Sequence, residues 1–331
     1  MTCLCCTTAC APKGEPDSSL EVAEKGLISA AFSPDGDYLF TGSFQHGGAL
    51  WNHETGERLY NWNLAPGSYS AFSTADFSED GKFVATTDGQ SVTIWDVDGG
   101  SVAGHLQSPA QALGIKNTSA IWTSPESETY WQKPGRIIDL ALSRQYLLLG
   151  LENQIALLVD ITSRSVIGGL PHDDVITSVA MDQAAELAVT GSRSGAAHLW
   201  SLETGARLAS YQTKSAINFV AISDNGAYLV VCAAQGPVQL IETKAEGRTI
   251  ELSKGNPGVT AARFDTRLGR LLIGTSRERV SLFNLSDGIK VQDWAISNDG
   301  PWHKAAVIDV AFTDTNPVAV GSNGRSYHLD N

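Results

Sequence analysis

One short phrase recurs along the chain at nearly regular intervals, and this repetition constrains the fold more than any single residue does. The phrase Ala49–Gly56 returns as Thr93–Gly100 and as His198–Gly205, each time with tryptophan at its third position. Weaker copies of the same frame occur at Leu158–Asp160, Leu240–Glu242, Leu282–Asn284 and Tyr327–Leu329. The tryptophan-equivalent positions 51, 95, 159, 200, 241, 283 and 328 are 44, 64, 41, 41, 42 and 45 residues apart. A period of about 40–45 residues is typical of a β-propeller, in which each repeat forms one four-stranded blade.

The residues within one repeat predict four strands joined by tight turns. In the first repeat we expect strands over Gly26–Ser33, Asp37–Ser43, Gly48–His53 and Arg58–Leu64. The first turn is Ser33–Gly36, where proline presets φ at the first corner and glycine accepts a positive φ at the exit. Related turns are predicted at Ser78–Gly81 and Ser223–Gly226.

The tryptophan phrases and the turns resemble the WD40 repeat family over roughly residues 26–329. The literal Trp-Asp pair occurs at Trp95-Asp96, whereas Trp51 and Trp200 fill the tryptophan position without the aspartate. The resemblance implies a ring of blades that binds a protein or peptide, commonly on the face around the central channel.

The hydrogen-bonded tetrad of histidine, serine or threonine, aspartate and tryptophan that is typical of this family is mostly missing. The fourth repeat has His172, Ser192 and Trp200, but Ser194 stands where the aspartate would be. We therefore expect the blades to be held together mainly by apolar packing between the sheets.

The last repeat provides three strands, Val307–Thr313, Pro317–Ser322 and Arg325–Leu329, and lacks an outer one. An unpaired strand edge promotes aggregation. The alternating segment Ser19–Glu24, within residues 18–25, has no blade of its own, so we predict that it is the missing strand. The predicted fold is an all-β, seven-bladed propeller of four-stranded antiparallel blades, closed by an N-terminal strand in the last blade. A six-bladed ring with loose ends is the alternative.

Two connections between blades are longer than the period requires. The step of 64 contains an insertion over residues 108–134, and Ala295–Lys304 is a second extended link. Both join an outer strand to the next inner strand, so both emerge on the same face of a propeller. Aromatic residues dominate binding hot spots, and loops on a rigid scaffold concentrate binding residues. The predicted partner-binding residues are Trp122, Tyr130, Trp131, Trp302 and His303. In the alternative interpretation, the aromatic rings fold back onto their own domain.

The N-terminal segment resembles the end of a bacterial lipoprotein signal. Small residues precede Cys10 in Cys6–Pro12, and the polar segment Lys13–Ser19 would be a tether. The predicted division is residues 1–17 as signal-like segment and tether, and residues 18–331 as propeller. This resemblance implies lipidation at Cys10 and a place in the bacterial cell envelope, at the periplasmic side of the outer membrane.

Two other interpretations of this segment stay open. Thiolates from Cys3, Cys5, Cys6 and Cys10 could bind a soft metal, although structural zinc sites favour C-x₂₋₄-C pairs. Alternatively the segment is a tail without a function of its own, on a cytoplasmic protein. Cys232, which stands alone in an apolar strand, is predicted to be a small buried residue.

Charge and composition argue against nucleic acid as a partner and against a membrane-spanning segment. A net charge of −13 without any run of lysine or arginine disfavours nucleic acid. No stretch approaches the ~20 apolar residues that span a bilayer, so we expect membrane contact only through a lipid at Cys10.

The sequence contains no recognisable catalytic motif, and we expect no enzyme activity, cofactor or metal. The seven histidines are scattered, with no H-E-x-x-H spacing, and no G-x-S-x-G elbow or phosphate-binding glycine loop occurs. The alternative is a propeller enzyme (a hydrolase, a lyase or a quinoprotein-like enzyme) with its site in the central channel. Ionisable side chains converging in that channel would favour the enzyme.

Overall fold

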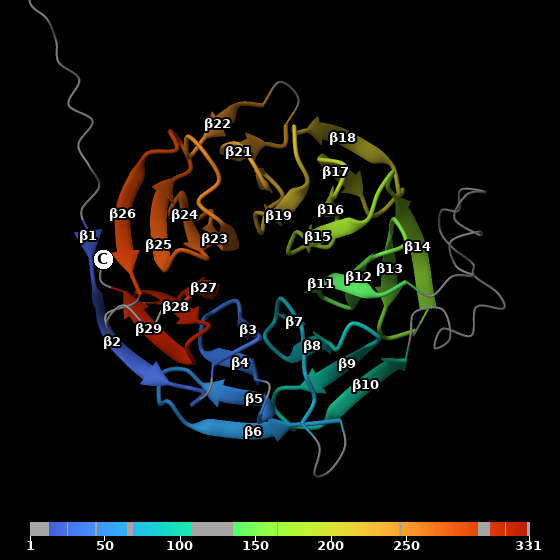
Figure 1. Ribbon diagram of the computed structural model, residues 1–331. Helices are drawn as coiled ribbons and strands as arrows, with labels where there is room; N and C mark the ends of the chain where they lie inside the picture. Colours follow the sequence, from blue (N-terminus) through green and yellow to red (C-terminus); the bar gives the residue numbers. More distant parts are fainter. Residues whose placement is uncertain are drawn as a thin grey trace, which may run out of the picture.

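The computed structural model shows a ring of β-sheets around a central axis (Figure 1). It describes residues 13–329 apart from residues 25, 44, 65–68, 108–134, 164, 245–246, 297–304 and 315. Within these ranges the regular secondary structure consists of β-strands alone, and the strands form seven sheets. The predicted all-β, seven-bladed propeller is therefore confirmed.

Each blade is an antiparallel meander that begins at the channel and runs outward. Blade 1 consists of β3 (Ser29–Phe32), β4 (Tyr38–Ser43), β5 (Gly47–Asn52) and β6 (Arg58–Trp62). Blade 2 consists of β7 (Thr74–Phe77), β8 (Phe83–Thr87), β9 (Ser91–Asp96) and β10 (Val102–Gln107). Blade 3 consists of β11 (Ile137–Ser143), β12 (Tyr146–Leu151), β13 (Ile155–Asp160) and β14 (Ser165–Pro171). Blade 4 consists of β15 (Ile176–Met181), β16 (Leu187–Ser192), β17 (Ala196–Ser201) and β18 (Arg207–Gln212).

The other three blades follow the same order. Blade 5 consists of β19 (Ile217–Ile222), β20 (Tyr228–Ala233), β21 (Val238–Glu242) and β22 (Thr249–Glu251). Blade 6 contains β23 (Val259–Asp265), β24 (Arg270–Thr275), β25 (Arg279–Asn284) and β26 (Lys290–Ala295). Blade 7 contains β27 (Val307–Phe312), β28 (Pro317–Gly321) and β29 (Arg325–Leu329).

The predicted turns have the conformation that their residues favour. At the three Ser-x-x-Gly turns the glycines Gly36, Gly81 and Gly226 have φ of 78°, 69° and 66°. Residues other than glycine rarely adopt this left-handed conformation, so glycine suits the tight reversal from the inner to the second strand. In the equivalent turn of blade 4, Ala185 adopts it with φ of 53°.

An N-terminal strand closes the ring, as predicted. β2 (Pro16–Glu21) pairs antiparallel with β29 and becomes the outer strand of blade 7. It starts two residues before the predicted 18–25, and its first residues lie in the segment assigned to a tether. Further upstream, β1 (Lys13–Gly14) pairs parallel with β26, so this one segment lies along the outer edges of blades 6 and 7 (Figure 1). A Cβ on Gly14 would lie 2.7 Å from Cδ1 of Trp294, so only glycine fits there.

The outer strands share one packing feature. We call the boundary between two neighbouring blades a seam. At the same register in every blade, the outer strand places one large apolar side chain in the seam with the next blade. These residues are Leu20, Trp62, Leu106, Leu170, Tyr211, Leu252 and Trp294. Leu20 belongs to the closing strand, which therefore packs like the other six outer strands.

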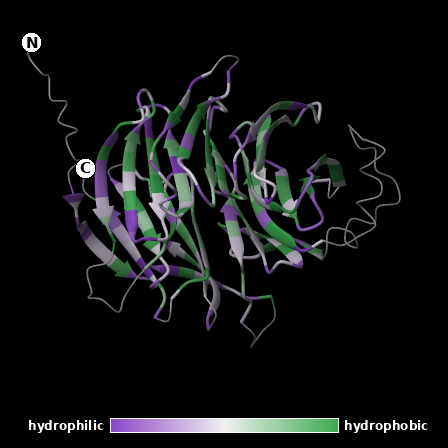
Figure 2. Cartoon of the chain, turned by 45° about the horizontal axis from the view of Figure 1, so that its top comes forward, coloured by the Kyte–Doolittle hydropathy of each residue, from purple (hydrophilic) through white to green (hydrophobic). Residues whose placement is uncertain are grey.

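Apolar packing holds the blades together, as the missing tetrads predicted. The core consists of seven hydrophobic clusters, and each cluster joins two neighbouring blades. Between blades 1 and 2, for example, the Trp62 and Trp95 rings stack with centroids 5.0 Å apart. Figure 2 shows hydrophobic residues along the strands. Cys232 is fully buried, as expected.

The register corrects one predicted position. His328 pairs with Val318 as Leu50 pairs with Phe40, so the tryptophan-equivalent residue of blade 7 is Leu329 and not residue 328. The sequence frame was misplaced by one residue because blade 7 has no tryptophan to mark it.

Candidate functional site

The central channel contains a hollow of about 350 Å³ lined by the inner strands of all seven blades. Most of the lining residues lie in the first half of these strands or just before them, for example Asp139 in β11 and Ser73 before β7, and the lining continues inward to Asp76 and Arg263. Inner strands begin on the face where each outer strand leads into the next blade. We call this face of the ring the connection face. The hollow therefore belongs to the connection face, where the long links were predicted to emerge.

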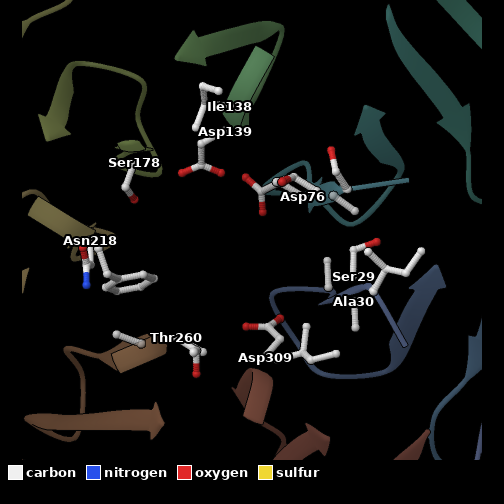
Figure 3. A pocket seen from close by; sticks show the side chains of 18 of the residues that line it. Ser29, Ala30, Asp76, Ile138, Asp139, Ser178, Asn218, Thr260 and Asp309 are labelled. Atoms are coloured by element: carbon white, nitrogen blue, oxygen red, sulfur yellow. The ribbon is translucent and has the colours of Figure 1, made fainter. Parts of the chain in front are cut away.

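Two rings of side chains follow from the register of the inner strands. The ring nearer the connection face consists of Ser29, Thr74, Asp139, Ser178, Phe219, Ala261 and Asp309. The ring two residues deeper consists of Ala31, Asp76, Ala141, Ala180, Ala221, Arg263 and Ala311. Five blades thus have alanine in the deeper ring, and the other two have an acid and a base. Figure 3 shows the carboxylates of Asp76, Asp139 and Asp309 pointing into the channel.

The channel aspartates join neighbouring blades. Asp139 of blade 3 accepts hydrogen bonds from the backbone N–H of Leu140, at 3.0 Å, and of Val179 in blade 4, at 2.9 Å. Asp76 of blade 2 repeats this arrangement: its Oδ1 accepts from Phe77, and its Oδ2 accepts from Leu142 of blade 3 at 2.8 Å. In both side chains each carboxylate oxygen is satisfied by a backbone donor.

Asp309 joins blades 7 and 1. Its Oδ2 accepts from the N–H of Phe32 at 2.8 Å and lies 3.7 Å from the Arg263 guanidinium. A hydroxyl joins blades 4 and 5 in a similar way: the Ser178 hydroxyl accepts a hydrogen bond from the backbone N–H of Val220 at 3.2 Å. The polar side chains of the channel therefore replace backbone hydrogen bonds that the curved ring leaves unmade between blades.

Burial controls the charge of these carboxylates. It raises the pKa of Asp76 to about 7, and the Leu142 hydrogen bond and the Arg263 charge only partly oppose it. Burial likewise raises the pKa of Asp139 to about 6 against its backbone hydrogen bonds. The pKa of Asp309 is also raised by burial, and here Arg263 is the main opposing influence. All three side chains are partly exposed, but only to the confined space of the channel.

Ionisable side chains therefore do converge in the channel, which is the arrangement that we expected to favour an enzyme. Three acids and one guanidinium lie on its wall. However, both oxygens of Asp76 and of Asp139 are used by backbone donors, as described above. Among the residues that the structure describes, no three His, Cys, Asp or Glu side chains lie close enough together to hold a metal ion.

The structure corrects the hydroxyl partner in the blade 4 tetrad. His172 Nε2 lies 2.5 Å from Oγ1 of Thr190, and Trp200 donates to the same oxygen at 2.8 Å. Ser192, the predicted partner, bonds Ser194 instead. The side-chain period of a strand explains the error: Thr190 and Ser192 face the same side, and Thr190 is the one opposite His198.

The histidines form two stacked pairs that their sequence positions did not suggest. The rings of His172 and His198 have centroids 4.5 Å apart, and those of His53 and His328 are 4.8 Å apart across the seam between blades 7 and 1. Burial, reinforced by the neighbouring ring, lowers the pKa of His172 to about 3 and that of His53 to about 4. The rings of His172 and His53 are thus neutral packing groups at physiological pH.

The predicted partner-binding residues and lipidation site lie outside the described residues. They are Trp122, Tyr130, Trp131, Trp302, His303 and Cys10. The strands that flank the long links are described: β10 and β26 lead to the connection face, and β11 and β27 start there.

A known family matches part of the chain. The WD domain, G-beta repeat family matches residues 14–52, which run from the second residue of β1 to the end of β5. A matched repeat does not coincide with one blade. It contains the outer strand β2 of blade 7 followed by β3, β4 and β5 of blade 1. A comparison with curated proteins finds no match. The resemblance to WD40 repeats is confirmed by this match together with the seven-bladed fold. Within the described part of the chain, no apolar helix reaches membrane-spanning length.

Proposed function

We propose that the protein is a non-enzymatic interaction scaffold that binds a protein or peptide on its connection face. We further propose that it is held at the bacterial envelope, on the periplasmic side of the outer membrane, by a lipid on Cys10. A propeller of this kind provides a rigid ring on which binding loops are presented, a use that suits the WD40 resemblance.

The placement of the two long links carries this proposal. Each link joins an outer strand to the next inner strand, and so both are rooted on the face to which the channel hollow belongs. Between them the links contain the aromatic residues Trp122, Tyr130, Trp131 and Trp302. Aromatic side chains around a concave centre are the usual composition of a protein-binding hot spot.

The hydrogen bonds of the channel support a scaffold over an enzyme. A general acid or base needs a carboxyl that can meet a substrate, whereas Asp76 and Asp139 hold backbone donors of two blades. Their raised pKa values follow from the burial that this structural role requires.

Photo-crosslinking in the native host tests the binding face. A photoreactive residue at position 131 or 302 should capture a defined partner, and Trp302→Ala or deletion of residues 108–134 should abolish capture while the fold is retained. Leu268 provides the control, because it is 64% exposed in the β23–β24 turn on the opposite face. Equal capture from position 268 would refute the assignment of the face.

Intact mass and membrane fractionation test the anchor. Expressed from its own upstream region, the chain should begin at a lipid-modified Cys10 and sediment with the outer membrane, and Cys10→Ala should release it. An unmodified, soluble chain that begins at Met1 would instead favour the cytoplasmic alternative and leave the binding face to be tested there.

The second candidate is a propeller enzyme with its site in the channel. It is favoured by the convergence of Asp76, Asp139 and Asp309 with Arg263. The variant Asp139→Asn separates the two candidates. A scaffold should still be crosslinked to its partner in this variant. Small molecules that bind the channel of the wild type but not that of Asp139→Asn would instead favour the enzyme.

A further inference from the structure

The seam between blades 7 and 1 contains a hollow of about 300 Å³, lined by the segment that follows β2 and by blade 1. Its lining residues include Trp51 and Thr41, and also Val22 and Ala49. Trp51 is partly exposed there, whereas Trp95 and Trp200, at the same position in blades 2 and 4, are 3% and 4% exposed. Trp51 is therefore covered less completely than its counterparts in blades 2 and 4.

Blade 4 shows what fills the same position. His172 bonds Oγ1 of Thr190, the ring of His198 stacks on His172, and both rings meet Trp200 edge-on at 6.2 and 5.6 Å. Trp200 donates to Thr190 from the other side. Two imidazole rings therefore occupy the space beside this threonine and tryptophan.

The register identifies the equivalent residues at the seam. The N–H of Val22 donates to the carbonyl of Gly324, just before β29, as the N–H of His172 donates to Gln154, just before β13. Val22 therefore takes the place of His172. Further along the blade, Ala49 pairs with Thr41 as His198 pairs with Thr190, so a methyl group replaces the second imidazole.

The threonine and tryptophan that these rings contact in blade 4 are nevertheless retained. Trp51 donates to Oγ1 of Thr41 at 2.9 Å, which leaves the hydroxyl hydrogen of Thr41 to donate to something else. The guanidinium of Arg58 lies over the Trp51 ring, 5.4 Å from its centroid, and Glu21 and Glu24 also line the hollow. The charged residues have both signs, so the hollow selects for ring shape and hydrogen bonding more than for net charge.

We propose that this hollow, the seam pocket, binds a small neutral heteroaromatic ring of the imidazole class. An acceptor nitrogen of the ring takes the hydrogen of the Thr41 hydroxyl, and its edge packs against Trp51, as His172 does in blade 4. The volume is at the lower end of small-molecule sites, about 300–1,000 Å³, and suits one ring with a short substituent.

Titration with imidazole at pH 8, where the ring is neutral, tests the proposal. The readout is the indole N–H resonance of Trp51, assigned with Trp51→Phe. We expect a saturable shift with imidazole and at least ~10-fold weaker binding of pyrrole, which has the same shape but no acceptor nitrogen and leaves the threonine hydrogen unpaired. No shift with imidazole, or equal binding of pyrrole, would overturn the proposal.

Filling the pocket provides the first control. Val22→His rebuilds the blade 4 arrangement and should abolish the shift, and Ala49→His fills the pocket from the other side if the first variant does not fold. A shift that persists in a folded filled variant would place the ligand elsewhere.

Blade 4 provides the matched converse. His172→Gly should create a second pocket of the same kind, so imidazole should raise the melting temperature of this variant more than that of the wild type. If imidazole stabilises His172→Gly but not the wild type, the geometry of the seam differs from that of blade 4 and the pocket is not a site. These measurements do not depend on the anchor or on the partner of the connection face.

Discussion

At the scale of single residues, the ring depends on side-chain oxygens that accept buried N–H groups. In blades 1, 2 and 4 the tryptophan donates to a threonine one strand away, at 2.9, 2.8 and 2.8 Å. In the channel, carboxylates accept the backbone N–H groups of the next blade. Leaving such a donor unsatisfied in the interior costs about 1–3 kcal/mol. These oxygens are therefore worth more to stability than their small number suggests.

Removing the threonine of blade 4 should destabilise the protein more than removing its counterpart in blade 1. Thr190→Val leaves both the Trp200 N–H and His172 Nε2 without a partner in a buried site, and we expect a loss of about 1–3 kcal/mol. Thr41→Val removes the acceptor of the Trp51 N–H alone, and Trp51 is partly exposed, so the loss should be smaller. Urea unfolding of both isosteric variants measures the difference, and equal losses would contradict it.

Replacing a channel aspartate should distinguish its hydrogen bonds from its charge. Asp139→Ala removes the acceptor of Val179 and Leu140 and should cost about 1–3 kcal/mol. Asp139→Asn keeps one acceptor oxygen and should lose clearly less. Denaturant midpoints at pH 7 provide the measurement; if both variants were as stable as the wild type, the carboxylate would have no structural role.

At the scale of elements, closure of the ring depends on strands from distant parts of the chain that meet in one sheet: β2 with β29 in blade 7 and β1 with β26 in blade 6. β2 pairs with β29 over its whole length and places Leu20 against Gly56 of blade 1. β1 adds only two residues to the edge of blade 6. The closure therefore depends on β2, with β1 as an extension.

Truncation should separate the contributions of the two strands. Deleting residues 1–14 removes β1 and should lower the melting temperature slightly. Deleting residues 1–21 exposes the edge of β29 and the seam core, and we expect a fall on the order of 10 °C and aggregation on heating. Calorimetry of both chains provides the test, and equal melting temperatures would show that the ring closes without β2.

At the scale of the whole molecule, stability reflects opposing titrations in different blades. Asp76 and Asp139 have raised pKa values and bind protons more tightly in the folded state than in the unfolded one. His53 and His172 have lowered pKa values and bind protons less tightly in the folded state. Acidification below neutral pH thus increases the contribution of the two aspartates to the free energy of unfolding and decreases that of the two histidines. In the pH range where both pairs titrate, the stability of the wild type should change little.

The carboxyl contribution is exposed by Asp76→Asn. The stability that Asp76 contributes is fully present below its unfolded pKa of 3.8 and is lost as the pH rises through its folded pKa of about 7. The wild type should therefore lose stability relative to Asp76→Asn as the pH rises from 4 to 7, and the difference should level off above that. If the difference in stability between the two proteins were constant with pH, folding would not shift the pKa of Asp76.

The histidine contribution has the opposite sign and is exposed by His172→Gln. The stability that neutral His172 contributes is present above its unfolded pKa of 6.5 and is lost as the pH falls toward its folded pKa of about 3. In the same pH series the wild type should thus lose stability relative to His172→Gln on acidification. A change in the same direction as that of Asp76→Asn would refute this assignment.

The architecture could be predicted from the residue pattern, because a propeller is built from local rules that repeat. Tryptophan spacing gave the number of blades, apolar alternation gave the strands, and Ser-x-x-Gly turns gave the reversals. The missing outer strand of the last repeat and the unassigned segment before the first predicted the closure. Each of these signals involves residues close together in the chain, or a period that can be counted.

Which residues from different blades meet became clear only from the folded ring. The channel acids Asp76, Asp139 and Asp309 lie in separate repeats, and although the repeats predict that their inner strands line one channel, no local pattern shows which side chains meet there. The same holds for the pairing of His53 with His328 and for the seam pocket, which exists because Val22 and Ala49 are small at positions that blade 4 fills with imidazoles. Sequence periodicity specifies the repeat, whereas the contacts across seams depend on ring closure, which brings together side chains that the chain itself keeps far apart.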